Sequence, residues 1–243
     1  MVKKIALILL SLLFLSYLVY AAVRFTHTPQ NEVCKTLHIY KVDSIDYNFI
    51  KRKEIEKHLT DNDIYPKGKK VDYAYTHAIE EKIKEMNYVK RAECYRTNHG
   101  DVAIRIWQRE PVVRIMTATE SYYIDQDREK MPISNNFTVM IQVVSGNITE
   151  TFAKNELFDF VEYVSNNEFW NAQIDQIYVT DTRKIELVPK VGSYTISLGT
   201  LDNYEDKLKK LYTFYKRYPQ LALTDTYSNI NIEYNKLLYA TKK

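Results

Sequence analysis

Histidine side chains are the groups of this chain best suited to metal or acid–base chemistry, and all five lie within the first hundred residues. They are His27, His38, His58, His77 and His99. No two of them have the spacing of metal ligands on one helix or loop. The chain also lacks His-Glu-x-x-His, Cys-x-x-Cys and Gly-x-Ser-x-Gly motifs, and its 5 glycines form no known phosphate-binding loop. A triad can be assembled from distant residues, but the sequence favours a protein that is not an enzyme, with no metal and no cofactor.

The two cysteines, Cys34 and Cys94, are the other reactive groups. An oxidising compartment permits a disulfide, but two cysteines in a chain of this size do not form a disulfide framework. We favour two half-buried thiols that pack as small hydrophobic groups. Whether Cys34 and Cys94 form a disulfide stays an open question.

Composition points away from nucleic acid and towards protein partners. The net charge of +3 is small and scattered, which does not suit a nucleic-acid surface. Tyrosine is frequent, with 21 residues. Its large apolar face, polar tip and few rotatable bonds suit interfaces.

The N-terminus carries a long uncharged run at residues 5–23, preceded by Lys3 and Lys4 and followed by Arg24. Nineteen helical residues rise about 28 Å, close to the thickness of the hydrocarbon core of a bilayer. We therefore predict a cytoplasmic head over 1–4, a transmembrane helix over 5–23 and a connector over 24–34. Lysines before a first span keep the N-terminus in the cytoplasm, so the bulk would be periplasmic, on a single-pass inner-membrane protein. A cleaved signal peptide is the alternative.

Residues 35–108 predict a compact β-α-α-β-β unit. Strands are expected over 36–42, 89–96 and 102–107, where Val102, Ile104 and Ile106 would face a core. Helices are expected over 49–59, capped by Asp46 or Asn48, and from Asp72 onward. The charges at 80–85 are interpreted as the solvated face of the second helix and not as catalytic carboxylates. The fold class is α+β.

Residues 109–243 predict a β-rich domain with a few helices. Strands are expected over 112–116, 122–125, 139–144, 176–180, 184–188 and 193–198, and helices over 156–164 and 202–218. The chain would end in a strand or hairpin over 227–239. A sheet that ends there has an edge with unpaired backbone groups, which recruits another strand or needs protection.

This order of features resembles the bacterial cell-division protein family FtsQ (DivIB), and the first exported unit then resembles a POTRA domain. Each local match is short, but their order is specific. They are QREPVVR at 108–114, YYID at 122–125, MPI at 131–133, VVSG at 143–146, ISLG at 196–199, KLKKL at 207–211, YP at 218–219 and INIEY at 230–234. The short head and many tyrosines look most like Bacteroidetes versions. The turn after Asp125 lacks the family's usual glycine, and Glu233 and Lys236 replace its usual arginine and small residue.

The resemblance implies a divisome scaffold that recruits FtsB-like and FtsL-like small coiled-coil membrane proteins and helps to control septal peptidoglycan synthesis. Its β domain would bind the FtsB-like partner by strand addition at the C-terminal edge. Proline at Ile232 or Asn235 is then expected to remove a partner-binding donor. Carried onto this chain, the partner-binding residues are Tyr227, Ile230, Ile232, Glu233, Tyr234, Asn235, Lys236 and Leu237.

Two other functions remain as alternatives. One is a POTRA-bearing component of an outer-membrane assembly or secretion system, which typically carries repeated POTRA units; no repeat is visible in the sequence. The other is a membrane-tethered envelope hydrolase, which requires His58, His77 and His99 to converge with carboxylates in a cleft.

Overall fold

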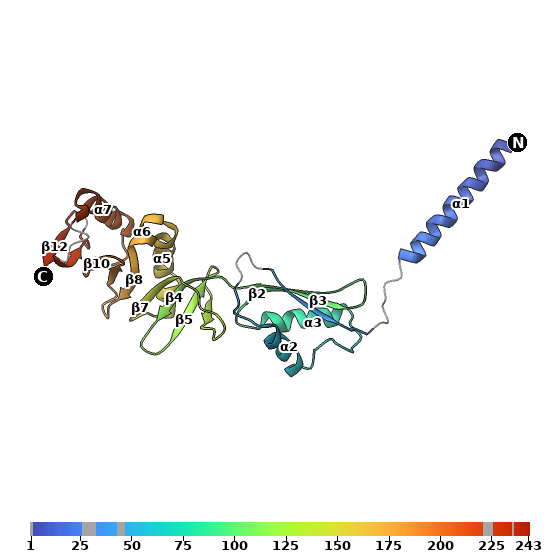
Figure 1. Cartoon of the computed structure of the whole chain (residues 1–243), viewed down its shortest axis with the longest axis horizontal. Coiled ribbons are helices and arrows are strands. Elements are labelled where there is room, and N and C mark those ends of the chain that lie inside the picture. The colour runs from blue at the N-terminus through green and yellow to red at the C-terminus, as the bar shows by residue number, and fades with distance from the viewer. Residues whose placement is uncertain (1, 26–32, 43–46, 221–225, 235) are drawn as a thin grey trace. The chain divides into compact units, whose positions relative to one another are not determined.

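The structure is a computed structural model that describes residues 2–25, 33–42, 47–220, 226–234 and 236–243 (Figure 1). It divides into two compact units, Met1–Gln108 and Arg109–Lys243. The first contains a three-stranded sheet and the second a nine-stranded sheet. These two units fit the predicted POTRA-like and β-rich architecture.

The first helix, α1 (Val2–Phe25), covers the uncharged N-terminal run. Crossing a bilayer takes about 20 consecutive, predominantly apolar helical residues. Within the described part of the chain, no helix combines the length and the apolar character that a membrane crossing needs. This finding contradicts the span predicted over residues 5–23, so that prediction and the single-pass inner-membrane location built on it are wrong.

The first unit has the predicted order of strand, helix, helix, strand, strand. Its elements are β1 (Leu37–Lys41), α2 (Arg52–Asp61), α3 (Tyr73–Lys84), β2 (Val89–Arg96) and β3 (Val102–Gln108). The sheet order is β1-β3-β2, with β1 parallel and β2 antiparallel to β3. Val102, Ile104 and Ile106 are buried, as their alternation predicts.

Helix α3 begins where the sequence predicts, because the side chain of Asp72 accepts a hydrogen bond from the Tyr75 N–H at 2.8 Å. Ile79 and Ile83, four residues apart, are both fully buried. Helix α2 instead begins at Arg52, three residues later than predicted, because Phe49 and Ile50 enter the core before the helix starts.

The buried side chain of Gln108 explains this late start. Its Oε1 accepts the Ile50 N–H at 3.2 Å, and its Nε2 donates to the carbonyl oxygen of Tyr47 at 2.5 Å. The segment thus satisfies its backbone through a distant side chain and needs no helical turn. Of the two predicted caps, Asn48 does not cap α2, and Asp46 lies outside the described residues.

Both cysteines of the first unit are free thiols. Cys34 is buried, and its thiol donates to the carbonyl oxygen of Thr36 at 3.3 Å. Burial raises the pKa of the half-buried Cys94 to about 12. Desolvation by burial also raises the pKa of Cys34. Both groups therefore stay protonated at neutral pH.

We expect neither thiol to react at pH 8 with iodoacetamide in the folded chain, because the thiolate is the nucleophile. A pKa of about 12 leaves roughly one thiolate in ten thousand Cys94 side chains at that pH. Mass spectrometry should find two labelled cysteines only after unfolding in guanidinium. Rapid labelling of Cys94 in the native chain would contradict this account of its burial.

The second unit contains nine strands. They are β4 (Pro111–Met116), β5 (Ser121–Asp125), β6 (Lys130–Pro132), β7 (Gln142–Gly146), β8 (Ile174–Val179), β9 (Ile185–Pro189), β10 (Thr195–Gly199), β11 (Tyr227–Asn231) and β12 (Tyr239–Lys242). Their order across the sheet is β12-β11-β10-β9-β8-β7-β4-β5-β6. The parallel pairs are β4 with β7, β7 with β8, and β10 with β11.

Helices occur in two of the three long connections between parallel strands. Between β7 and β8 lie α4 (Glu150–Lys154), α5 (Glu156–Asn166) and α6 (Glu168–Gln173), and between β10 and β11 lies α7 (Tyr204–Arg217). Leu157, Phe160 and Val161 of α5 are fully buried, and Leu208 and Leu211 of α7 join the same core.

Several short elements of the second unit were not predicted. They are α4, α6, β6 and β12, none longer than six residues. Strand β7 also begins at Gln142 and not at residue 139. Such short segments show too few periods of burial to be recognised from sequence alone.

Candidate functional site

The two edges of the nine-stranded sheet differ in how they are closed. At one edge, β6 is only three residues long and includes Pro132, which has no N–H to donate. At the other edge, β12 pairs with β11 on one side, and no other described strand pairs with it. Short strands, prolines and charged side chains are the usual protection of an edge. The C-terminal edge is therefore the open one.

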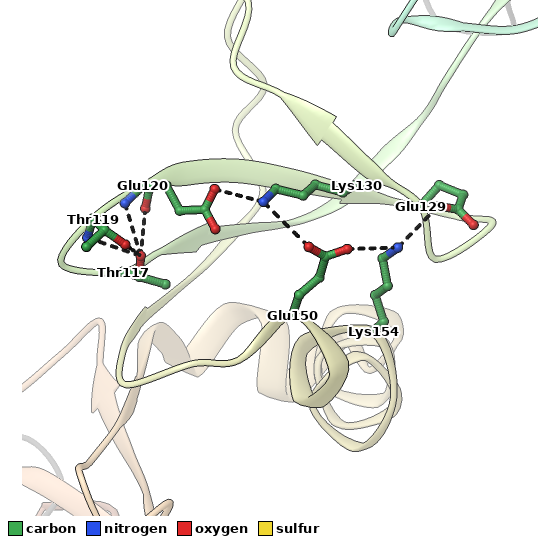
Figure 2. Close-up of polar contacts among 7 residues, drawn as sticks. All are labelled: Thr117, Thr119, Glu120, Glu129, Lys130, Glu150 and Lys154. Carbon is green, nitrogen blue, oxygen red and sulfur yellow. Dashed lines mark hydrogen bonds and ion pairs between the residues drawn. The ribbon is translucent and has the colours of Figure 1, made fainter.

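A chain of alternating charges reinforces the β6 edge (Figure 2). Lys130 lies 2.7 Å from Glu120 and 3.6 Å from Glu150. Lys154 in turn lies 3.1 Å from Glu150 and 3.2 Å from Glu129. These ion pairs are largely exposed, so each stabilises the fold by less than about 1 kcal/mol. Together they link the β5–β6 hairpin to α4 and cover that end of the sheet with charge.

On its outer side, the backbone of β12 offers groups that pair with no other described strand. The N–H of Lys243 donates to the carbonyl oxygen of Thr226 at 3.1 Å, towards β11. Lys242, which lies opposite Tyr227, therefore points its N–H and C=O away from β11. By the two-residue alternation of a strand, Ala240 does the same. An extended peptide could pair with these two residues.

Three exposed apolar side chains lie in and just before β12, and we call them the edge platform: Tyr234, Leu237 and Tyr239. Their exposed fractions are 53%, 61% and 46%. The rings of Tyr234 and Tyr239 stack with centroids 6.1 Å apart. Large apolar surface beside unpaired strand groups is characteristic of a protein-binding site.

The loop that carries the edge platform is held from several sides. Lys184 forms an ion pair of 2.8 Å with Glu233, and the Glu233 N–H donates to Asn231 Oδ1 at 3.0 Å. Gly199, with φ of +79°, lies directly against the Glu233 side chain. A Cβ at Gly199 would lie 2.4 Å from the Glu233 Cγ.

A lysine of α7 holds the same loop through its backbone. The Lys210 ammonium donates to the carbonyl oxygens of Ile232 at 3.1 Å and Leu237 at 2.9 Å, and to that of Tyr234. Its neighbour Lys207 is buried and donates to the carbonyl oxygen of Thr200 at 2.7 Å. Burial lowers the pKa of both lysines.

The predicted partner-binding residues fall into two groups. Tyr227, Ile230 and Ile232 belong to or directly follow β11, an interior strand, and the two isoleucines are fully buried. The exposed members are Tyr234, Lys236 and Leu237. Glu233 is half-buried in its ion pair, and Asn235 lies outside the described residues.

The N–H of Ile232 has a partner inside the protein. It donates to the carbonyl oxygen of Ser197 at 2.9 Å. Proline at Ile232 would therefore break a bond between β10 and the end of β11 and would not test partner binding. Sequence reasoning missed the open strand β12, Tyr239 as an exposed anchor, and the contacts of Lys210 and Gly199, which join residues far apart in the chain.

The histidines give no catalytic arrangement among the described residues. His58 Nε2 lies 2.9 Å from the carbonyl oxygen of Lys82, while His77 and His99 are exposed. His77 and two neighbouring carboxylates, Glu80 and Glu81, bring their ligand atoms within 4.8 Å of one another on α3.

Those carboxylates already have a cation. Lys84 forms ion pairs of 2.7 Å with Glu80 and 3.0 Å with Glu81. Glu80 also accepts the Cys94 N–H at 3.3 Å. The cluster is thus the charged face of an amphipathic helix, in agreement with its interpretation from the sequence.

Comparison with known families identifies both units. The family model described as FtsQ/DivIB, C-terminal related, matches residues 110–241, and the POTRA-like domain model matches residues 32–107. No curated protein matches the chain. A POTRA-like domain followed by such a β domain defines a cell-division-related class of proteins, generally non-enzymatic scaffolds that take part in the divisome. The chain belongs to the FtsQ/DivIB, C-terminal related family, which confirms the resemblance seen in its sequence.

Proposed function

We propose that this protein is a divisome scaffold whose β domain binds an FtsB-like protein by strand addition to β12, recruits an FtsL-like protein with it, and helps to control septal peptidoglycan synthesis. The observation that carries the proposal is the open backbone of Ala240 and Lys242 beside the edge platform. A partner strand would complete the sheet at this edge.

Addition of a partner strand to β12 would supply enough binding free energy for a specific complex. Four outward backbone groups on Ala240 and Lys242 would stabilise the complex by about 2–6 kcal/mol, at roughly 0.5–1.5 kcal/mol for each hydrogen bond. Burial of the exposed parts of Tyr234, Leu237 and Tyr239 adds a hydrophobic contribution. Tyrosine and other large side chains at the centre of an interface commonly supply most of its affinity.

The charges near β12 bear on the chemistry of the partner. Lys236 and Lys242 are exposed, and the Lys243 ammonium donates to the Ser193 hydroxyl at 2.7 Å. The nearby acid, Glu233, is already paired with Lys184. A basic edge favours a partner strand with aspartate or glutamate beside its apolar residues.

The test places a photocrosslinking amino acid at position 234 of the full chain in dividing cells. We expect mass spectrometry to identify an extended segment of an FtsB-like coiled-coil protein, with the FtsL-like protein co-purifying. Tyr234→Ala should lower the amount of co-purified partner about tenfold, because an exposed aromatic anchor is lost. Its thermal midpoint should stay within a few degrees of the wild type.

The matched control is Tyr178→Ala, which removes a tyrosine of similar exposure, 42%, from β8 in the middle of the sheet. It should leave the capture of the partner unchanged. Equal loss in both variants, or crosslinks to unrelated proteins alone, would refute the assignment of the edge.

A further inference from the structure

Between its described residues, 232–234 and 236–238, the β11–β12 loop has few hydrogen bonds of its own. Among the described residues, the backbone bond recorded within it is a long one, from the Leu237 N–H to the carbonyl oxygen of Tyr234 at 3.3 Å. Exposed loops with so few internal bonds usually sample many conformations, and ordering one residue costs about 1–2 kcal/mol. The edge platform therefore depends on contacts from outside the loop.

We infer that Lys210 is the positioning residue of this loop: its ammonium gathers the carbonyl oxygens of Ile232, Tyr234 and Leu237 and so sets the edge platform beside β12 before a partner arrives. The inference deepens the proposed function and rests on it for the role of the platform. An ammonium has three N–H donors, and here each meets one carbonyl.

The position of Lys210 makes this arrangement specific. It projects from α7, whose Leu208 and Leu211 are fully buried and anchor the helix in the core. The three carbonyls span six residues of loop, from 232 to 237. The Lys210 ammonium, carried by an anchored helix, thus contacts carbonyls at both ends and within a segment that carries two of the three platform residues. Ordering before binding lowers the entropy that the partner must offset.

Lys210 is half-buried, which raises the importance of these bonds. Desolvation, followed by repulsion from Lys207, disfavours its charged form and lowers its pKa. A partly buried ammonium needs acceptors to remain in place. Here the acceptors are backbone carbonyl oxygens of the loop and not a carboxylate side chain. The hydrogen bonds of Lys210 therefore depend on the backbone conformation of the loop.

The first arm of the test is hydrogen exchange on the full chain without a partner, comparing Lys210→Met with Lys209→Met. Lys209 is the matched control, because it is exposed on the same helix and no hydrogen bond joins it to a described residue of the loop. We expect exchange at the amides of Leu237, which donates to Tyr234, and Tyr239, which pairs with Asn231, to rise at least tenfold in Lys210→Met only. Exchange in the interior strands β8 and β9 should stay unchanged, which a general loss of stability would not allow. Lys210→Arg, which keeps N–H donors, should restore much of the protection.

The second arm measures the affinity of the same chains for the FtsB-like protein identified through the crosslink at position 234. We expect Lys210→Met to bind at least fivefold more weakly than Lys209→Met. Unchanged loop exchange in Lys210→Met would overturn the inference, as would faster loop exchange with unchanged affinity. If the wild-type chain binds no such protein, the proposed function fails, while the exchange arm still decides whether Lys210 orders the loop.

Discussion

A chain carrying Lys242→Pro should fold normally and lose at least nine tenths of its captured FtsB-like partner. The backbone N–H of Lys242 points away from β11, so proline there removes a donor that no described residue of the protein accepts from. An added strand would lose that hydrogen bond and would meet the proline ring at the edge. The measurement is the amount of partner that co-purifies with the full chain, beside its thermal unfolding.

The matched control is Lys242→Ala, which removes the same charge and keeps the N–H. It should retain most of the binding. Thr241→Pro should instead remove a donor that the protein uses. Thr241 lies opposite Asn229, and its N–H points towards β11. That variant should detach β12 and speed its hydrogen exchange. Equal capture by the Lys242→Pro and Lys242→Ala chains would show that the partner does not pair with this strand.

Gly199→Ala should destabilise the β domain by about 3 kcal/mol and weaken partner binding. The positive φ of +79° costs an alanine about 1–2 kcal/mol. The new Cβ would also lie 2.4 Å from Cγ and 3.0 Å from Cβ of Glu233, which adds a cost of about 1–3 kcal/mol for overpacking. Glu233 would have to move and give up its ion pair with Lys184.

Gly68→Ala is the control for the backbone cost alone. Its φ of +81° is nearly the same, but a Cβ there meets nothing within 4 Å. It should cost only about 1 kcal/mol. The two tryptophans allow the unfolding of each unit to be followed separately during denaturation, because Trp107 lies in the first unit and Trp170 in the second. Equal costs at both glycines would contradict the close contact between Gly199 and Glu233.

The local elements of both units could be predicted from their own residues. The Asp72 cap and the pair Ile79 and Ile83 specify α3 with interactions that span four residues. Alternation in β3 specifies its buried face in the same way. The start of α2 could not be predicted, because Ile50 is held by Gln108, 58 residues further along the chain. The membrane span predicted over 5–23 was wrong as well.

The family follows from the order of motifs along the chain, which sequence alone displays. Which strand forms the open edge was decided only by the tertiary structure. β11 has a mostly polar sequence with two asparagines, yet it pairs in parallel with β10 and becomes interior. β12, four residues long, carries too little pattern to be recognised.

The contacts that hold the edge platform were also decided by the tertiary structure and not by local sequence. The residues of α7 predict an amphipathic helix, but nothing local indicates that Lys210 meets carbonyls more than twenty residues away. Likewise, Gly199 reads as a turn residue, and only the fold places Glu233 against it. Hydrophobic periodicity and helix capping act over a few residues and can be recognised in the sequence. Strand order and loop anchoring depend on contacts between residues far apart in the chain, which no short pattern encodes.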